Sequence, residues 1–221
     1  MVGNPKISWE VQENIGFVRL VDEPENRMDT RFFRELLELT KNIIPAADVA
    51  AILVTGKGRH FSSGADLEDL RKTIHGGHYS HDFLMANYRS FRFFDDVNIP
   101  VVVAIKGVCL GSGLELALHG DFRLCSADAL FGLPEATFDL IPGAGGIQKF
   151  VQFAGKAKAM ELIMQGKSFS AEEALRLHIV DAIFPKKELE EKAIQLAKRV
   201  AGDYRKYNKK DYLKELTHRE I

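Results

Sequence analysis

The sequence predicts an α/β fold, in which short buried strands alternate with helices. Residues 50–55 (A-A-I-L-V-T) and 100–105 (P-V-V-V-A-I) have the length and aliphatic composition of buried strands. Each segment runs into a glycine-containing turn that is followed by a helical pattern. The chain has 221 residues, of which 46% are hydrophobic, so one sizeable core in a single domain is expected.

The first elements are predicted by side-chain periodicity. Residues 7–12 and 16–21 alternate polar and apolar side chains, so they are expected to pair as a hairpin turned at residues 14–16. Residues 29–44 have the period of an amphipathic helix, and Pro45 is expected to end it. The side chains expected to face inward from this helix are Phe33, Leu36, Leu37 and Ile44.

Later helices are indicated by capping and periodicity. Ser170 and Glu173 have the spacing of a capping box, which should start a helix that runs to Leu177. Helical patterns also cover residues 65–72, 82–95 and 188–200.

The most informative stretch is residues 107–121, G-V-C-L-G-S-G-L-E-L-A-L-H-G-D. A strand enters a turn that contains Gly107, Gly111 and Gly113, and a helix then opens with Glu115 on its first turn. Free backbone N–H groups and the positive end of the helix dipole would converge there. This arrangement predicts a site that stabilises developing negative charge, beside a carboxylate that is able to carry a proton.

The turn by itself has other readings. Spacing alone is also explained by close packing of a strand against a helix. A dinucleotide-binding fingerprint would need glycine at position 116, where Leu116 stands. A phosphate loop at residues 166–168 would need glycine at position 161, where Glu161 stands.

A second glycine turn lies in residues 56–67, G-K-G-R-H-F-S-S-G-A-D-L. The N–H of Ala65, which follows Gly64, is expected to be exposed at its tip. Two such turns on neighbouring parallel strands would offer one N–H each to a single oxygen atom. A serine nucleophile elbow centred on Ser62 is disfavoured because His60 replaces the glycine that this motif needs.

A third segment, residues 129–146, presents another carboxylate. Glu135 follows a short strand and stands twenty positions after Glu115, in a loop stiffened by prolines and glycines. Two carboxylates that converge on an apolar pocket would have pKa values that are raised or moved apart, as general acid–base chemistry requires. A solvated loop glutamate is the alternative interpretation.

Together the three segments resemble the enoyl-CoA hydratase/isomerase family, the crotonases. The resemblance runs from the first hairpin to about residue 185 and includes residues 155–175, which are similar to that family's helix pair. It implies a repeated β-β-α spiral over residues 1–185, with parallel strands near 17–21, 50–55, 101–106 and 129–131 and helices outside. Residues 186–221 would form a helical segment that is shorter than in typical relatives.

The resemblance also implies roles for residues. The N–H groups of Ala65 and Ser112 would hold the thioester oxygen of an acyl-CoA, Glu115 would deprotonate water, and Glu135 would protonate carbon C2. Asp139 would add a third carboxylate that modulates the pair. The residues implied in binding the substrate or its CoA portion are Arg27, Ser63, Gly64, Asp66, Leu67, Gly111, Pro134 and Gly143.

The reaction predicted from this resemblance is reversible syn-hydration of 2-enoyl thioesters, carried by CoA or by a carrier protein. No metal and no cofactor is expected beyond the CoA of the substrate. The alternatives are double-bond isomerisation of enoyl-CoA and a catalytically idle, crotonase-like accessory protein that assists a partner enzyme or binds RNA.

Charge and composition bear on partners and location. Lys and Arg number 30 and Asp and Glu number 31, a net charge of −1, so no nucleic-acid partner is expected. No stretch resembles a signal peptide or a membrane span, and two cysteines suit a reducing compartment, so a cytoplasmic protein without membrane contact is expected. The family resemblance implies a homotrimer or a dimer of trimers.

Overall fold

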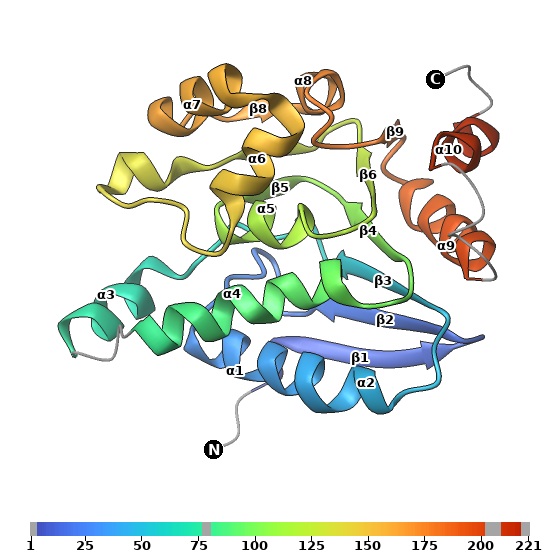
Figure 1. Cartoon of the computed structure of the whole chain (residues 1–221), viewed down its shortest axis with the longest axis horizontal. Coiled ribbons are helices and arrows are strands. Elements are labelled where there is room, and N and C mark those ends of the chain that lie inside the picture. Colours follow the sequence, from blue (N-terminus) through green and yellow to red (C-terminus); the bar gives the residue numbers. More distant parts are fainter. Residues whose placement is uncertain (1–3, 77–80, 202–208, 218–221) are drawn as a thin grey trace.

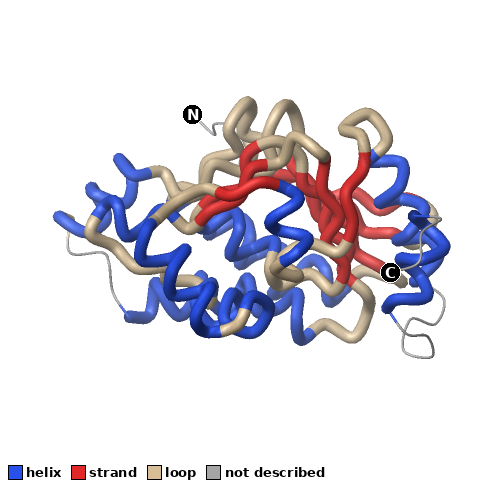
Figure 2. Tube along the Cα trace, turned by 90° about the horizontal axis from the view of Figure 1, so that it is seen from above, coloured by secondary structure: helices blue, strands red, loops and turns tan. Residues whose placement is uncertain are grey.

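A six-stranded sheet lies at the centre of the fold. The computed structural model describes residues 4–76, 81–201 and 209–217. The strand order is β1-β2-β3-β4-β6-β9, and only the β1–β2 pair is antiparallel. Helices cover both of its faces (Figures 1 and 2). The strands are β1 (Ile7–Gln12), β2 (Ile15–Leu20), β3 (Ala51–Gly56), β4 (Val101–Ile105), β6 (Phe122–Ser126) and β9 (Ala182–Phe184).

A second, smaller sheet contains β5 (Val108–Leu110), β7 (Leu130–Gly132) and β8 (Phe169–Ser170). The chain passes from β4 in the large sheet to β5 in the small one, and likewise from β6 to β7. A helix or helical turn follows each time. This repeated unit of two strands and a helix confirms the predicted β-β-α spiral.

One predicted strand occupies another place in the spiral. Residues 130–132 pair with β5 in the small sheet, and the unpredicted strand β6 lies beside β4. Strand β6 was not predicted because the charged residue Arg123 interrupts its run of apolar residues. This buried guanidinium donates to the carbonyl oxygens of Ile179 and Gly120, each at 2.7 Å, which satisfies its donors inside the fold.

The first helical region continues past Pro45. A π-helical turn, Leu39–Ile43, joins α1 to α2, and Pro45 lies at the start of α2, where its missing N–H is not needed. The helical region ends at Ala46, so the expected end at Pro45 is confirmed within one residue. Leu36, Leu39 and Ile44 are buried, whereas Leu37, which was expected to face inward, is 37% exposed.

The other predicted helices are present with shifted ends. Ser170 caps α8 and accepts from the N–H of Glu173, as expected. No helix of the described residues is long and apolar enough to cross a membrane. The helices are α1 (Thr30–Glu38), α2 (Ile44–Ala46), α3 (Leu67–His75), α4 (His81–Asp96), α5 (Ser112–Ala117), α6 (Gly146–Ala154), α7 (Lys156–Gln165), α8 (Ala171–Arg176), α9 (Leu189–Val200) and α10 (Lys209–Thr217).

The large sheet is buried on both faces, because successive side chains of a strand point to opposite sides. Val18, Ile52 and Val103 belong to the core under α1 and α4. Leu53 and Val102 belong to a second core with α9 and α10. A doubly covered sheet is a rigid support for the loops that leave its strands.

Candidate active site

Parallel pairing of the short second strands brings three turns together. Ser62 pairs with Cys109 in an isolated bridge, and Cys109 pairs with Phe131 between β5 and β7. In this register Ala65 and Ser112, three positions further along, share one end of the small sheet. Glu135 leaves the same end, four positions after Phe131. The two predicted N–H donors and the second glutamate are therefore placed by one strand alignment.

The first turn requires glycine at position 64. Gly64 has φ +93°, and a Cβ there would come within 2.7 Å of the carbonyl oxygen of Leu110. The buried Ser62 hydroxyl holds the turn: it accepts from the N–H of Gly64 at 3.1 Å and donates to the carbonyl of Asn26 at 2.7 Å. The N–H of Ala65 follows this fixed point.

The second turn requires glycine at position 111. Gly111 has φ +51° and begins α5, and its N–H donates to the carbonyl of Gly132 at 2.9 Å. The next N–H, of Ser112, lies in the first turn of the helix, where N–H groups have no intrahelical acceptor. Neither this N–H nor that of Ala65 finds an acceptor among the residues that the structure describes. Two free donors therefore face one space.

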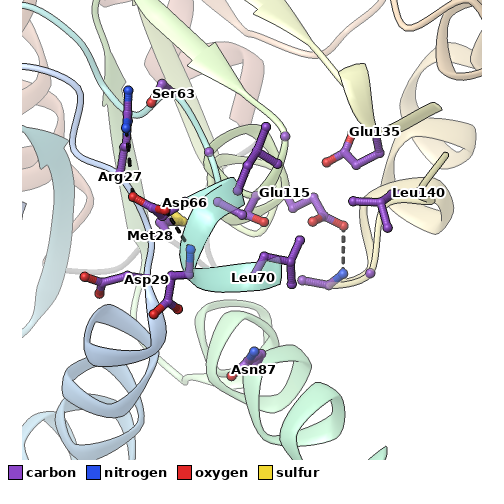
Figure 3. Close-up of a pocket in the computed structure, with 18 of the residues that line it drawn as sticks. Arg27, Met28, Asp29, Ser63, Asp66, Leu70, Asn87, Glu115, Glu135 and Leu140 are labelled. Atoms are coloured by element: carbon purple, nitrogen blue, oxygen red, sulfur yellow. Dashed lines mark hydrogen bonds and ion pairs between the residues drawn. The ribbon is translucent and has the colours of Figure 1, made fainter. Parts of the chain in front are cut away.

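That space is a cavity of about 510 Å³, shown in Figure 3. Its volume lies within the usual range for small-molecule sites. Ala65, Ser112 and both glutamates line it, and its apolar wall includes Met28, Leu70 and Leu84. Every residue implied by the family resemblance in substrate or CoA binding also lines it: Arg27, Ser63, Gly64, Asp66, Leu67, Gly111, Pro134 and Gly143.

Glu115 is buried and bonded to a loop. Its side-chain carboxylate oxygen Oε1 accepts from the backbone N–H groups of Ala144 at 2.8 Å and Gly146 at 2.9 Å. Burial raises the pKa of Glu115, and the hydrogen bonds from Gly146 and Ala144 and the charge of His119 oppose this rise. Hydrogen bonds that end on the carboxylate favour its ionised form.

Glu135 has the opposite environment. Its Oε2 is buried without a hydrogen-bond partner among the described residues. Burial, and after it the nearby charge of Glu115, raises the pKa of Glu135 to about 7. Figure 3 shows both carboxylates turned into the same space. Hydrogen bonds therefore favour the ionised form of Glu115, whereas burial favours the protonated form of Glu135.

Asp139 does not join this pair. It is exposed, takes the left-handed conformation with φ 57° after the 3-10 turn Pro134–Phe138, and is absent from the cavity lining. Its exposed carboxylate is therefore not part of the cavity that Glu115 and Glu135 line. The expectation of a third carboxylate at the site is corrected here.

Arg27 reaches the cavity mouth already paired. Its guanidinium forms ion pairs with Glu25 and, at 3.9 Å, with Asp66 (Figure 3). Its side chain is 52% exposed, so these pairs are weak and exchangeable. An anionic group at the mouth would compete with two carboxylates for this cation.

Several residues of the site escaped sequence reasoning. The N–H donors of Ala144 and Gly146 come from a glycine-rich loop whose partner lies 29 to 31 positions away. The glycine at position 146 was the sequence feature that could have indicated this contact. A side chain there would collide with Glu115, because a Cβ would lie 2.6 Å from its Cγ. Ser62 also escaped, because it was considered as a nucleophile and not as an anchor of the turn.

The chain is similar to enoyl-CoA hydratases over nearly its whole length. A family model described as enoyl-CoA hydratase/isomerase matches residues 10–220. A probable enoyl-CoA hydratase of Bacillus subtilis is 34% identical over 198 residues, which span 90% of this chain and 75% of that protein. A probable mitochondrial enoyl-CoA hydratase of Dictyostelium discoideum is 31% identical over 195 residues, which span 87% of this chain and 69% of that protein.

Solved structures agree with the sequence comparisons. The crystal structure of an enoyl-CoA hydratase from Bacillus anthracis superposes with a TM-score of 0.80 at 32% identity, covering 89% of this chain and 76% of that one. The longer alpha subunit of the fatty acid oxidation complex from Pseudomonas syringae pv. tomato is 35% identical over 188 residues, which span 84% of this chain and 26% of that subunit.

The raised pKa of Glu135 predicts a pH-dependent stability. The folded chain keeps a proton on Glu135 up to pH about 7, whereas the unfolded chain loses it near the ordinary value of 4.5. This contribution is complete below pH about 4.5 and is lost as the pH rises through about 7. Between pH 5 and pH 8 the wild type should lose up to about 3 kcal/mol more unfolding free energy than Glu135→Gln.

Urea unfolding at the two pH values measures this difference. Asp139→Asn is the matched control, because it neutralises an exposed carboxylate four positions away. It should keep the wild-type pH dependence. Equal pH dependence of the wild type and Glu135→Gln would contradict the burial of an unpaired carboxyl group.

Proposed function

Because the chain belongs to the enoyl-CoA hydratase/isomerase family, we propose that it catalyses the reversible syn-hydration of 2-enoyl-CoA thioesters. The observation that carries the proposal is the unequal environment of two carboxylates in one cavity. Glu115 accepts two backbone hydrogen bonds, whereas Glu135 has a buried oxygen without a partner. Hydration needs one base and one acid, and this difference supports such a division of roles.

The thioester oxygen binds the free N–H groups of Ala65 and Ser112. As water adds to C3, negative charge moves onto this oxygen and forms an enolate. Two fixed N–H donors stabilise that charge without reorganisation. The dipole of α5 adds to the effect because Ser112 lies at the N-terminus of this helix.

Water is activated by Glu115. Its Oε1 is occupied by the loop, so the other carboxylate oxygen takes a proton from the attacking water as the O–C3 bond forms. Glu135 then gives its proton to C2, and the enolate electron pair becomes the new C–H bond. Both groups lie in one cavity and reach one side of the substrate, which gives syn addition. Transfer of the proton from Glu115 back to Glu135 through solvent restores the starting state.

The proposed function also concerns cofactors, oligomeric state and cellular location. We propose that the reaction uses only the backbone N–H groups and the two glutamates of this chain, without a metal or a redox cofactor. We propose that the chain forms a homotrimer or a dimer of trimers, and the cytoplasmic location stays a prediction. Support for assembly comes from exposed apolar side chains on neighbouring elements: Phe138, Ile141, Met160 and Met164 are 48%, 77%, 55% and 74% exposed.

The two acids can be tested by isosteric change. Glu115→Gln and Glu135→Gln keep side-chain size but remove proton transfer, so each should lower kcat for crotonyl-CoA hydration by roughly 10²–10⁴. Loss of the conjugated thioester absorbance measures the rate. If either variant hydrates crotonyl-CoA at nearly the wild-type rate, the reaction does not need both carboxylates, and the two-carboxylate mechanism is wrong.

The oxyanion site can be tested at the backbone. Ala65→Pro deletes one N–H donor and should lower the rate by about 10²–10³, whereas Ser112→Ala keeps its N–H and should retain most activity. Circular dichroism and an unchanged particle size check that the proline variant is folded. Near-normal turnover by folded Ala65→Pro would show that the thioester oxygen binds elsewhere.

Assembly can be measured directly. Sedimentation equilibrium should give three or six times the mass of one chain. Met164→Glu places a charge on the exposed apolar surface of α7 and should shift the wild-type assembly toward smaller species. A wild-type protein that sediments as a single chain would contradict the assembly proposal.

A further inference from the structure

One buried histidine lies beneath the loop that holds Glu115. His119 follows α5 and is 3% exposed. Its Nδ1 lies 2.6 Å from a carboxylate oxygen of Asp95 on α4. Its Nε2 lies 3.4 Å from the carbonyl oxygen of Ala144. The proposed reaction gives this residue no role.

Both groups that contact the imidazole ring of His119, the Asp95 carboxylate and the Ala144 carbonyl, are hydrogen-bond acceptors. A carbonyl oxygen only accepts hydrogen bonds, and an ionised carboxylate does likewise. Burial opposes ionisation of Asp95, but its hydrogen bonds to His119 and Lys149 outweigh burial and lower the pKa of Asp95. Asp95 is therefore an acceptor, and both ring nitrogens of His119 face hydrogen-bond acceptors. A neutral ring would place a lone pair against the carbonyl or the carboxylate.

The same loop connects His119 to Glu115. The carbonyl oxygen of Ala144 lies 3.4 Å from Nε2 of His119, and the N–H of Ala144 donates to Glu115 at 2.8 Å. Gly145 follows with φ +97°, and a Cβ there would lie 3.0 Å from the Tyr88 ring and 3.4 Å from Nε2 of His119. The loop is thus clamped between the imidazole on one side and the glutamate on the other.

We propose that His119, held as an imidazolium between Asp95 and the carbonyl of Ala144, is a positioning residue that fixes the orientation and the charge of Glu115. The chemical consequence of this role rests on the proposed hydration, because there Glu115 must be an ionised base. A cation on one side of the loop steadies a carboxylate on the other. This division keeps Glu115 ionised while Glu135 remains protonated in the same cavity.

The other charged and titratable groups around the contact do not replace His119. From α6, Lys149 pairs with the second oxygen of Asp95, and from α4, Tyr88 receives a hydrogen bond from Arg92 at 3.2 Å. Asp121 turns to the N–H of Val101 at 2.8 Å. His119 is the side chain whose ring nitrogen lies 3.4 Å from the carbonyl oxygen of Ala144, in the loop bonded to Glu115.

The effect on Glu115 has a definite sign. The charge of His119 lowers the pKa of Glu115, so its removal raises that pKa. Hydration needs Glu115 ionised, and the rate therefore rises with pH through this pKa. Without the imidazolium, the low-pH limb of the kcat profile should move to higher pH. KM for the thioester should change little, since His119 does not line the cavity.

Nuclear magnetic resonance tests the assignment without relying on turnover. In the wild type at pH 7.5, the ¹⁵N shifts of His119 should show two protonated ring nitrogens, assigned by their loss in His119→Gln. The ¹³C titration of the Glu115 carboxyl, assigned with Glu115→Gln, should move to higher pH in His119→Gln. A bare ring nitrogen in the wild type, or an unmoved Glu115 titration, would overturn the proposal.

Kinetics with crotonyl-CoA provide the second readout. His119→Gln and Asp95→Asn should both move the low-pH limb upward, because each removes the imidazolium. Asp95→Asn also covers the case in which His119→Gln does not fold. His75→Gln, at an exposed histidine of α3 outside the cavity lining, is the matched control and should leave the profile unchanged. If the low-pH limb of the kcat profile does not move in either folded variant, His119 has only a packing role.

The NMR titrations and the kinetics distinguish a failure of the proposed hydration from a failure of the proposed role of His119. A wild type that does not hydrate enoyl thioesters would refute the proposed function, while the two titrations would still decide the role of His119. Active enzyme with a neutral His119 ring would refute only the further inference.

Discussion

The site depends on parallel pairing between very short strands. Ser62, Cys109 and Phe131 are aligned across the small sheet, and each begins a turn that contributes one part of the cavity. A slip of one residue would turn Ala65 or Ser112 away from the space that they share. The large sheet makes this alignment possible, because it is covered on both faces and holds the entry points of the three turns in fixed register. Glycine at positions 64 and 111 then permits backbone conformations that other residues rarely adopt.

Burial of two carboxylates in one apolar cavity is costly unless their protonation differs. The fold resolves this by giving two loop N–H donors to Glu115 and leaving Oε2 of Glu135 without a partner among the described residues. The pKa of Glu135 at about 7 follows from that inequality, with burial as the main cause and the charge of Glu115 as the next. The loop is thus as much a part of the proton chemistry as the glutamates.

Where sequence reasoning was wrong, a contact distant in the chain was the cause. Strand β6 was not predicted, because Arg123 looks incompatible with burial until Ile179 and Gly120 supply acceptors. Asp139 was expected at the site, but it is exposed and does not line the cavity. Each error concerns a residue whose local preference was overridden by neighbours that the local pattern does not reveal.

The sequence alone determined the α/β class, the hairpin, both glycine turns and the two glutamates, because strand composition, glycine spacing and helix capping are local properties. The resemblance to a family then gave the spiral and linked Ala65 and Ser112 as a pair of donors. Tertiary structure decided which groups surround each carboxylate. The bonds of Glu115 to Ala144 and Gly146, and the contact of His119 with the same loop, join residues 25 to 31 positions apart. A pKa depends on burial and on such neighbours, and these exist only once the chain has folded.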